Sequence, residues 1–171
     1  MACRQRASRR GSGHSACAQI PAKDPVRIGR GRMTGVLLDT NVISELTRPK
    51  PAPPVIAFLA AQEDLWLSTL VLHELEFGVL LLPSGGRRDA LRGILSELLR
   101  RYEDRVIAVD TEAATWAARF RVDARRSGRT LDLGDALIAG TAKAHGLAVA
   151  TRNVTDFRGL DLVVANPWDF G

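Results

Sequence analysis

Cysteine is scarce in this sequence, and long apolar runs are absent. Cys3 and Cys17 are too few to form a disulfide framework or a structural zinc site. We therefore expect a cytoplasmic protein, since the cytoplasm keeps thiols reduced. No uninterrupted apolar run approaches the ~18 residues that a membrane-spanning helix needs, so no membrane association is expected.

Acidic residues are nearly missing from the first 32 positions. This stretch carries eight Lys and Arg residues against one acid, Asp24, and contains no aromatic residue. Such a composition buries too little apolar surface to order the chain, and no apolar segment of the kind found in secretory signals follows the basic residues. Residues 1–32 are either a basic arm that touches nucleic acid or sequence upstream of a misassigned start. We favour the second interpretation, because an apolar strand begins two residues after Met33.

Residues 33–171 have the pattern of a single α/β domain. Short apolar runs predict strands at 35–38, 65–67, 106–109, 147–150 and 162–164. Capping residues and apolar spacings of three and four predict helices at 40–46, 54–62, 69–82, 87–104, 111–126 and 132–144. Strands that are apolar throughout and alternate with helices indicate a mainly parallel central sheet of four to five strands, covered on both faces.

Acidic residues lie where such sheets form their ligand sites, beyond the carboxyl ends of the strands. Asp39 directly follows the first predicted strand, and Asn153 and Asp156 follow the fourth. Glu74 and Asp135 lie on helices among apolar neighbours, where a carboxylate is costly unless it is paired or bound to a cation. Oxygen ligands without a cluster of Cys or His indicate Mg²⁺ or Mn²⁺. A metal held in this way is suited to phosphodiester hydrolysis.

Each of these acids also has an ordinary structural interpretation. Asp39 could cap a helix, Glu74 could pair with an arginine, and Asp156 could be a turn residue. Asp132 stands three residues before Asp135 at a helix start, and for Asp132 we favour a capping role. For Asp135 the two interpretations are evenly balanced on the residues alone.

Four local motifs, in order along the chain, add a family resemblance. They are Leu37-Leu38-Asp39-Thr40-Asn41-Val42-Ile43-Ser44-Glu45, Ser68-Thr69-Leu70-Val71-Leu72-His73-Glu74-Leu75, Asp135-Ala136-Leu137-Ile138-Ala139-Gly140 and Thr151-Arg152-Asn153-Val154-Thr155-Asp156-Phe157. Together they resemble PIN-domain nucleases of the VapC toxin type. The closing Asn166-Pro167-Trp168 is typical of the branch that includes FitB-like proteins. The resemblance implies a PIN-like α/β/α sandwich over residues 33–171.

The resemblance also implies roles for individual residues. Asp39, Glu74 and Asp135 fall on the three acidic positions that bind the metal. The fourth position often holds Asp in the family and is Asn153 here, which leaves Asp156 as a substitute or an outer group and leaves open whether one or two metal ions bind. Supporting residues that would orient the metal or its waters follow from the same motifs: Thr40, Asn41 and Thr151.

Basic residues close to these motifs in the sequence are candidates for holding the RNA backbone. They are Arg48, Lys50 and Arg152, and a solvated surface explains them equally well. The resemblance further implies a homodimer and a small antitoxin partner, with DNA contacted indirectly through the antitoxin. The apolar segments around 70–82 and 91–99 could supply a surface for either protein partner or belong to a well-covered core.

Three functions can be weighed against this pattern. The first is a toxin that acts as an Mg²⁺-dependent endoribonuclease, and the second is a non-catalytic subunit of a DNA-binding toxin–antitoxin complex. The set of Asp39, Glu74 and Asp135 favours the first, because a structural subunit has no need of clustered acids. A flap-type DNA nuclease would need helical insertions for which residues 33–171 leave no room.

Overall fold

A computed structural model describes residues 35–171. The proposed extension, residues 1–32, lies outside the described residues. The described part contains a five-stranded sheet in the order β3-β2-β1-β4-β5, in which every neighbouring pair is parallel. Its strands are β1 (Val36–Leu38), β2 (Leu65–Ser68), β3 (Val106–Ile107), β4 (Ala148–Ala150) and β5 (Val164–Ala165). The predicted parallel sheet is therefore confirmed.

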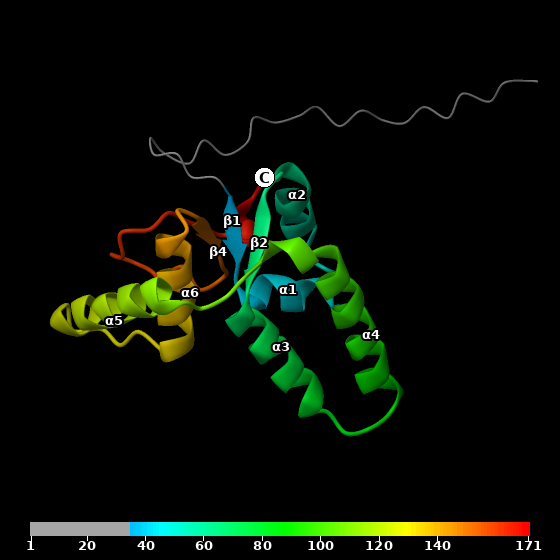
Figure 1. The fold of residues 1–171 in the computed structure, drawn as a ribbon. Helices are drawn as coiled ribbons and strands as arrows, with labels where there is room; N and C mark the ends of the chain where they lie inside the picture. The colour runs from blue at the N-terminus through cyan, green and yellow to red at the C-terminus, as the bar shows by residue number, and fades with distance from the viewer. Residues whose placement is uncertain (1–34) are drawn as a thin grey trace, which may run out of the picture.

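Helices cover both faces of this sheet, which confirms the predicted α/β/α sandwich (Figure 1). They are α1 (Thr40–Leu46), α2 (Pro53–Ala61), α3 (Thr69–Leu80), α4 (Gly86–Arg101), α5 (Thr111–Arg126) and α6 (Leu133–Ala144), with short 3₁₀ turns η1 (Glu103–Arg105) and η2 (Pro167–Asp169). In Figure 1, α5 and α6 lie on one side of the strands and α1 to α4 on the other. None of the helices within residues 35–171 is long and apolar enough to cross a bilayer.

The two edge strands are shorter than their apolar runs predicted. β3 ends at Ile107. Two residues later, the Val109 N–H donates to the Thr69 hydroxyl (3.2 Å) and not to the backbone of a neighbouring strand. β5 begins at Val164, although the Val163 carbonyl already accepts a hydrogen bond from the Val149 N–H (2.9 Å). An edge strand has a neighbour on one side alone, so the apolar pattern does not fix where its pairing stops.

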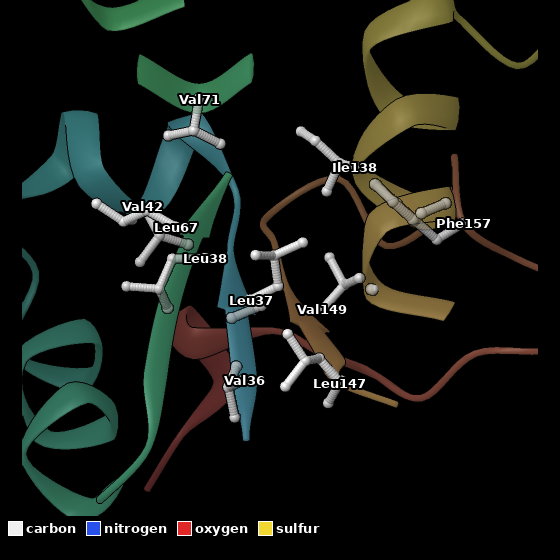
Figure 2. Packing of buried hydrophobic residues seen from close by; sticks show 14 of the residues in the cluster. Val36, Leu37, Leu38, Val42, Leu67, Val71, Ile138, Leu147, Val149 and Phe157 are labelled. Atoms are coloured by element: carbon white, nitrogen blue, oxygen red, sulfur yellow. The ribbon is translucent and has the colours of Figure 1, made fainter. Parts of the chain in front are cut away.

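The core lies between the sheet and the two helical layers. Leu37, Leu38 and Val149 are fully buried on the central strands β1 and β4. Figure 2 shows Val42 and Leu67 on one side of β1, and Ile138 and Phe157 with α6 on the other. Because both faces are covered, the strands carry apolar residues at successive positions rather than at alternating ones.

Helices α5 and α6 pack so closely that Gly140 has no room for a side chain. A Cβ atom there would lie 2.2 Å from the Ala113 carbonyl oxygen and 2.8 Å from the Ala117 nitrogen. Alanine favours a helix over glycine by roughly 1 kcal/mol, but forcing two backbones apart costs about 1–3 kcal/mol. We expect Gly140→Ala to lower the thermal midpoint by several degrees, measured by circular dichroism.

Gly93 provides a matched control for this prediction. It lies on α4, is exposed, and has no atom within 4 Å of an added Cβ. Gly93→Ala should therefore stabilise the protein by about 0.5–1 kcal/mol. A similar gain in both variants would show that α5 and α6 can separate without cost.

Candidate metal centre

Asp39 is held at the junction between β1 and α1. Its side chain is 5% exposed and caps α1, with Oδ1 accepting a hydrogen bond from the Thr40 N–H (2.6 Å). Oδ2 accepts from the Thr151 hydroxyl (2.6 Å) and from Asn41 Nδ2 (2.5 Å). The capping role is thus real, but it accounts for one of the two carboxylate oxygens. The other is fixed by residues from two separate motifs.

Within residues 35–171, no ion pair includes Asp39. Burial raises the pKa of Asp39, and repulsion from Glu74 acts in the same direction. Hydrogen bonds from Thr151, Thr40 and Asn41 oppose this effect without cancelling it. A buried carboxylate in this condition is stabilised by any cation that reaches it.

Glu74 reaches the same region from α3. The Thr40 hydroxyl donates a hydrogen bond to Glu74 Oε2, which joins the second motif to the first. A Cβ atom on Gly134 would lie 3.0 Å from Glu74 Oε1, so this carboxylate stands against the first turn of α6. Asp135 occupies that same turn. Acids from three segments that are distant in the sequence therefore meet near the carboxyl end of β1, the edge at which such sheets form their sites.

Asp135 has the most perturbed carboxyl group in this region. Its pKa is raised to about 6, first by burial and then by repulsion from four other carboxylates: Asp39, Asp156, Asp132 and Glu74. Asp132 caps α6 as predicted, with Oδ1 accepting from the Gly134 N–H (2.8 Å). It also adds negative charge to the site, a contribution that its capping pattern did not reveal.

The segment after β4 completes the site. Thr151 is fully buried, and its hydroxyl oxygen accepts from the Asn153 N–H (3.0 Å). Asn153 itself is exposed. Asp156 follows in a turn, where its N–H donates to the Asn153 carbonyl (3.0 Å). Asp156 is thus both a turn residue and one of the charges that act on Asp135.

The three basic candidates are not equally placed. Arg48 follows the far end of α1 and forms an ion pair with Glu45 (3.2 Å). Glu45 is buried, and its Oε1 also accepts from the Ala52 N–H (2.9 Å), so it ties α1 to the start of α2. Lys50 lies exposed in the connecting loop. By contrast, the Arg152 N–H donates to Asn41 Oδ1 (3.1 Å), directly beside Asp39.

The donor set fits a hard divalent cation in its chemistry. All the groups are carboxylates, hydroxyls and amides, the ligands that Mg²⁺ and Mn²⁺ prefer. Burial and repulsion from neighbouring carboxylates raise the pKa values of Asp39 and Asp135, and such a cation would stabilise their ionised forms. Within residues 35–171, no three side chains of His, Cys, Asp or Glu already stand at the spacing of a metal site. Binding would therefore require the carboxylates to converge.

The raised pKa of Asp135 predicts a pH-dependent cost to folding. An acid whose pKa rises from about 3.9 in the unfolded chain to about 6 in the folded one destabilises the fold when it is ionised. This cost is fully present above pH 6 and disappears as the pH falls towards 4. Allowing for partial exposure, we expect Asp135→Asn to add about 1–2 kcal/mol to the free energy of unfolding at pH 8.

Urea denaturation in the presence of EDTA measures this effect. At pH 8 the variant should be more stable than the wild type, and at pH 4 the two should converge. The exposed Asp104 provides a control, since Asp104→Asn should change little at either pH. A gain for Asp135→Asn that persisted undiminished at pH 4 would be inconsistent with charge repulsion as its source.

Comparison with known proteins finds related sequences and structures. The PIN domain family matches residues 36–161. Over 137 residues the chain is 39% identical to the VapC ribonuclease Y4jK of Sinorhizobium fredii, covering 78% of this chain and 98% of that protein. It is 40% identical over 136 residues to Toxin FitB of Neisseria gonorrhoeae, again covering 78% and 98%. The solved structure of FitAB bound to an IR36 DNA fragment superposes with a TM-score of 0.75 at 37% identity, covering 80% of this chain and 97% of that one.

Proposed function

This chain belongs to the PIN-domain family, and on that premise we propose that it is the toxin of a type II toxin–antitoxin system and an endoribonuclease that hydrolyses RNA with Mg²⁺. The observation that supports this most is the group of carboxylates around Asp39 and Asp135, which repel one another and form no ion pair within residues 35–171. Mn²⁺ would substitute, because it accepts the same oxygen ligands.

Asp39, Glu74 and Asp135 would hold the metal ion. When bound, Mg²⁺ supplies a Lewis acid that lowers the pKa of water and offsets charge developing on a phosphate. The Thr151 hydroxyl and the Asn41 amide fix the orientation of Asp39, and the Thr40 hydroxyl fixes Glu74. Such outer contacts restrict the rotamers that the ligands can adopt.

Asn153 and Asp156 complete the proposed catalytic set from the loop after β4. Asn153 is neutral at a position where the family resemblance implies an acid, so the site carries one negative charge fewer. Asp156 supplies part of the missing negative charge, because its carboxylate repels that of Asp135. We place both outside the direct ligands.

A purely structural role is the alternative function. In that case the chain would be a non-catalytic subunit that stabilises its partner in a DNA-binding complex. Asp39 is only 5% exposed, and burying it without a cation would then lower the stability of the fold without contributing to any function. This cost is the reason that we favour catalysis.

Cleavage of total bacterial RNA by the purified full chain tests the proposal. We expect fragments to appear with Mg²⁺ or Mn²⁺ and to disappear on addition of EDTA. Intact RNA under all metal conditions, from protein shown to be folded by circular dichroism, would support the structural alternative instead.

Protein partners form a second part of the proposal: a homodimer, and an antitoxin through which DNA would be contacted indirectly. The end of α3 and the facing α4 project together beyond the sheet (Figure 1). Large apolar side chains are exposed there at 44–69%: Phe77, Leu80, Leu81 and Ile94. Exposed apolar clusters of this kind are typical of interaction surfaces. We assign this surface to the antitoxin, whose counterpart is present in the FitAB structure.

The assignment is tested by co-purification of the chain with the product of any short reading frame found to adjoin its gene. Leu81→Asp should reduce the recovered partner, whereas Val122→Asp, which changes an exposed side chain on α5, should not. Loss of self-association in Leu81→Asp, with the antitoxin still bound, would assign the surface to a second copy of the chain.

Residues 1–32 are proposed to be dispensable. The family match starts at residue 36, and the extension carries a charge pattern unlike that of the rest of the chain. Deletion up to Met33 should leave the thermal midpoint and the RNA cleavage rate unchanged. Failure of the shortened chain to fold would show that the extension is part of the domain.

A further inference from the structure

The closing motif Asn166-Pro167-Trp168 lies beside the candidate metal centre. It directly follows β5, whose Ala165 carbonyl accepts from the Thr151 N–H (3.0 Å). Pro167 is buried at the start of η2, and Asn166 Oδ1 accepts from the Trp168 N–H (3.1 Å). The motif therefore fixes the position of its own tryptophan next to the segment that carries Thr151.

Trp168 contacts Arg152 through its ring. The Arg152 guanidinium carbon lies 5.3 Å from the Trp168 ring centroid, within the range of a cation–π interaction. The backbone of Arg152 is held at the other end, since its N–H donates to Asn41, which in turn donates to Asp39. Two hydrogen bonds thus connect Arg152 to the centre of the acidic site.

In the part of the chain that the structure describes, no carboxylate pairs with the Arg152 guanidinium. None of the ion pairs formed within residues 35–171 includes Arg152, whereas Arg48 is engaged by buried Glu45. Attraction to an aromatic face holds the cation without occupying its N–H donors. Those donors can therefore bind a phosphate in the bidentate manner that guanidinium groups favour.

An RNA backbone approaching this site meets strong repulsion. Burial, together with repulsion from neighbouring carboxylates, raises the pKa values of Asp39 and Asp135, and the same negative field opposes a polyanion. A positive group fixed at the rim would offset this repulsion for the phosphates next to the one that is cut. Of the three basic candidates, Arg152 is the one whose backbone bonds to a residue that itself bonds to Asp39.

We propose that Trp168 is a positioning residue that holds the Arg152 guanidinium at the rim of the acidic site, where it binds an RNA phosphate adjoining the cleaved bond. This inference rests on the proposed ribonuclease function. It gives the closing motif a role in substrate binding that is separate from the metal ligands.

The test compares KM and kcat for the shortest RNA fragment that the wild type cleaves. Trp168→Leu should raise KM about two- to fivefold with kcat nearly unchanged, because one exposed cation–π contact is lost. Trp168→Phe keeps an aromatic face and should restore most of the wild-type KM. Arg152→Ala should raise KM about tenfold, the effect of losing a charged hydrogen bond.

Two further comparisons separate positioning from a structural role. Adding Trp168→Leu to Arg152→Ala should raise KM no further, because the tryptophan would act through the arginine. Trp116 provides a matched control on α5, where it holds Arg119 at 4.8 Å and Lys143 at 5.4 Å. Trp116→Leu removes the same type of contact and should leave KM unchanged.

The outcomes also distinguish this inference from the proposed function. Wild-type cleavage that needs metal, together with an unchanged KM in Trp168→Leu, would overturn the positioning role alone. Additive increases of KM in the double variant would do the same. Absence of metal-dependent cleavage in the wild type would instead contradict the ribonuclease function.

Discussion

Asp39→Asn should abolish RNA cleavage and leave the fold intact. The substitution removes one full charge from a carboxylate that we assign to the metal, and a neutral amide is a poorer ligand for a hard cation. Stabilisation by a metal ion is worth several kcal/mol in such reactions, so we expect the rate to fall by about a thousandfold or more. Single-turnover cleavage at saturating enzyme measures this rate directly.

Folding of this variant is checked by its thermal midpoint without metal. Because burial and Glu74 raise the pKa of Asp39, removing its charge relieves repulsion, and the midpoint should be equal or higher. Asp123→Asn is the control, since Asp123 is exposed on α5 and pairs with Arg126 at 3.7 Å. If the folded Asp39→Asn variant cleaved RNA at the wild-type rate, Asp39 would have no role in catalysis.

Asp156→Ala should lower the cleavage rate by about 10–100-fold, the range typical of groups that act through a metal ligand. Asp156 acts on Asp135 through its charge, and its own N–H is part of the turn after Thr151. The loss should therefore be smaller than that in Asp39→Ala. The same single-turnover assay, run over a range of Mg²⁺ concentrations, compares the two variants.

A complete loss in Asp156→Ala, equal to that in Asp39→Ala at every metal concentration, would make Asp156 a direct ligand. The site would then hold its metal through four carboxylates rather than three. Such a result would also change the role assigned to Asn153. With Asp156 as a ligand, the neutral Asn153 side chain would no longer leave the metal site with one carboxylate fewer.

The sequence predicted the fold well because its central strands are buried on both faces. β1 and β4 are apolar at every position, and helices separate them, which few architectures other than a covered parallel sheet allow. The meeting of Asp39, Glu74 and Asp135 was also predictable. Asp39 follows β1, Asp135 lies in the first turn of α6 and Glu74 lies within α3, and the family motifs select the same residues.

Contacts between segments that are distant in the sequence were harder to predict. Nearness along the chain suggested Arg48 as an RNA contact, but α1 carries it away from Asp39 and buried Glu45 engages it. Glu45 was missed as a structural residue, although a lone acid within an apolar helix was a signal. The pairing of Arg152 with Trp168 joins two motifs across β4 and β5, and no local pattern indicates it.

Calorimetric titration of Mn²⁺ into the metal-free protein tests the central claim most directly, because it needs no RNA target. If Asp39 and Asp135 hold the metal, the wild type should bind Mn²⁺, and Asp39→Asn and Asp135→Asn should each bind it about tenfold more weakly or worse. The control Asp123→Asn should match the wild type. Undiminished Mn²⁺ binding in both site variants would contradict the assigned metal centre.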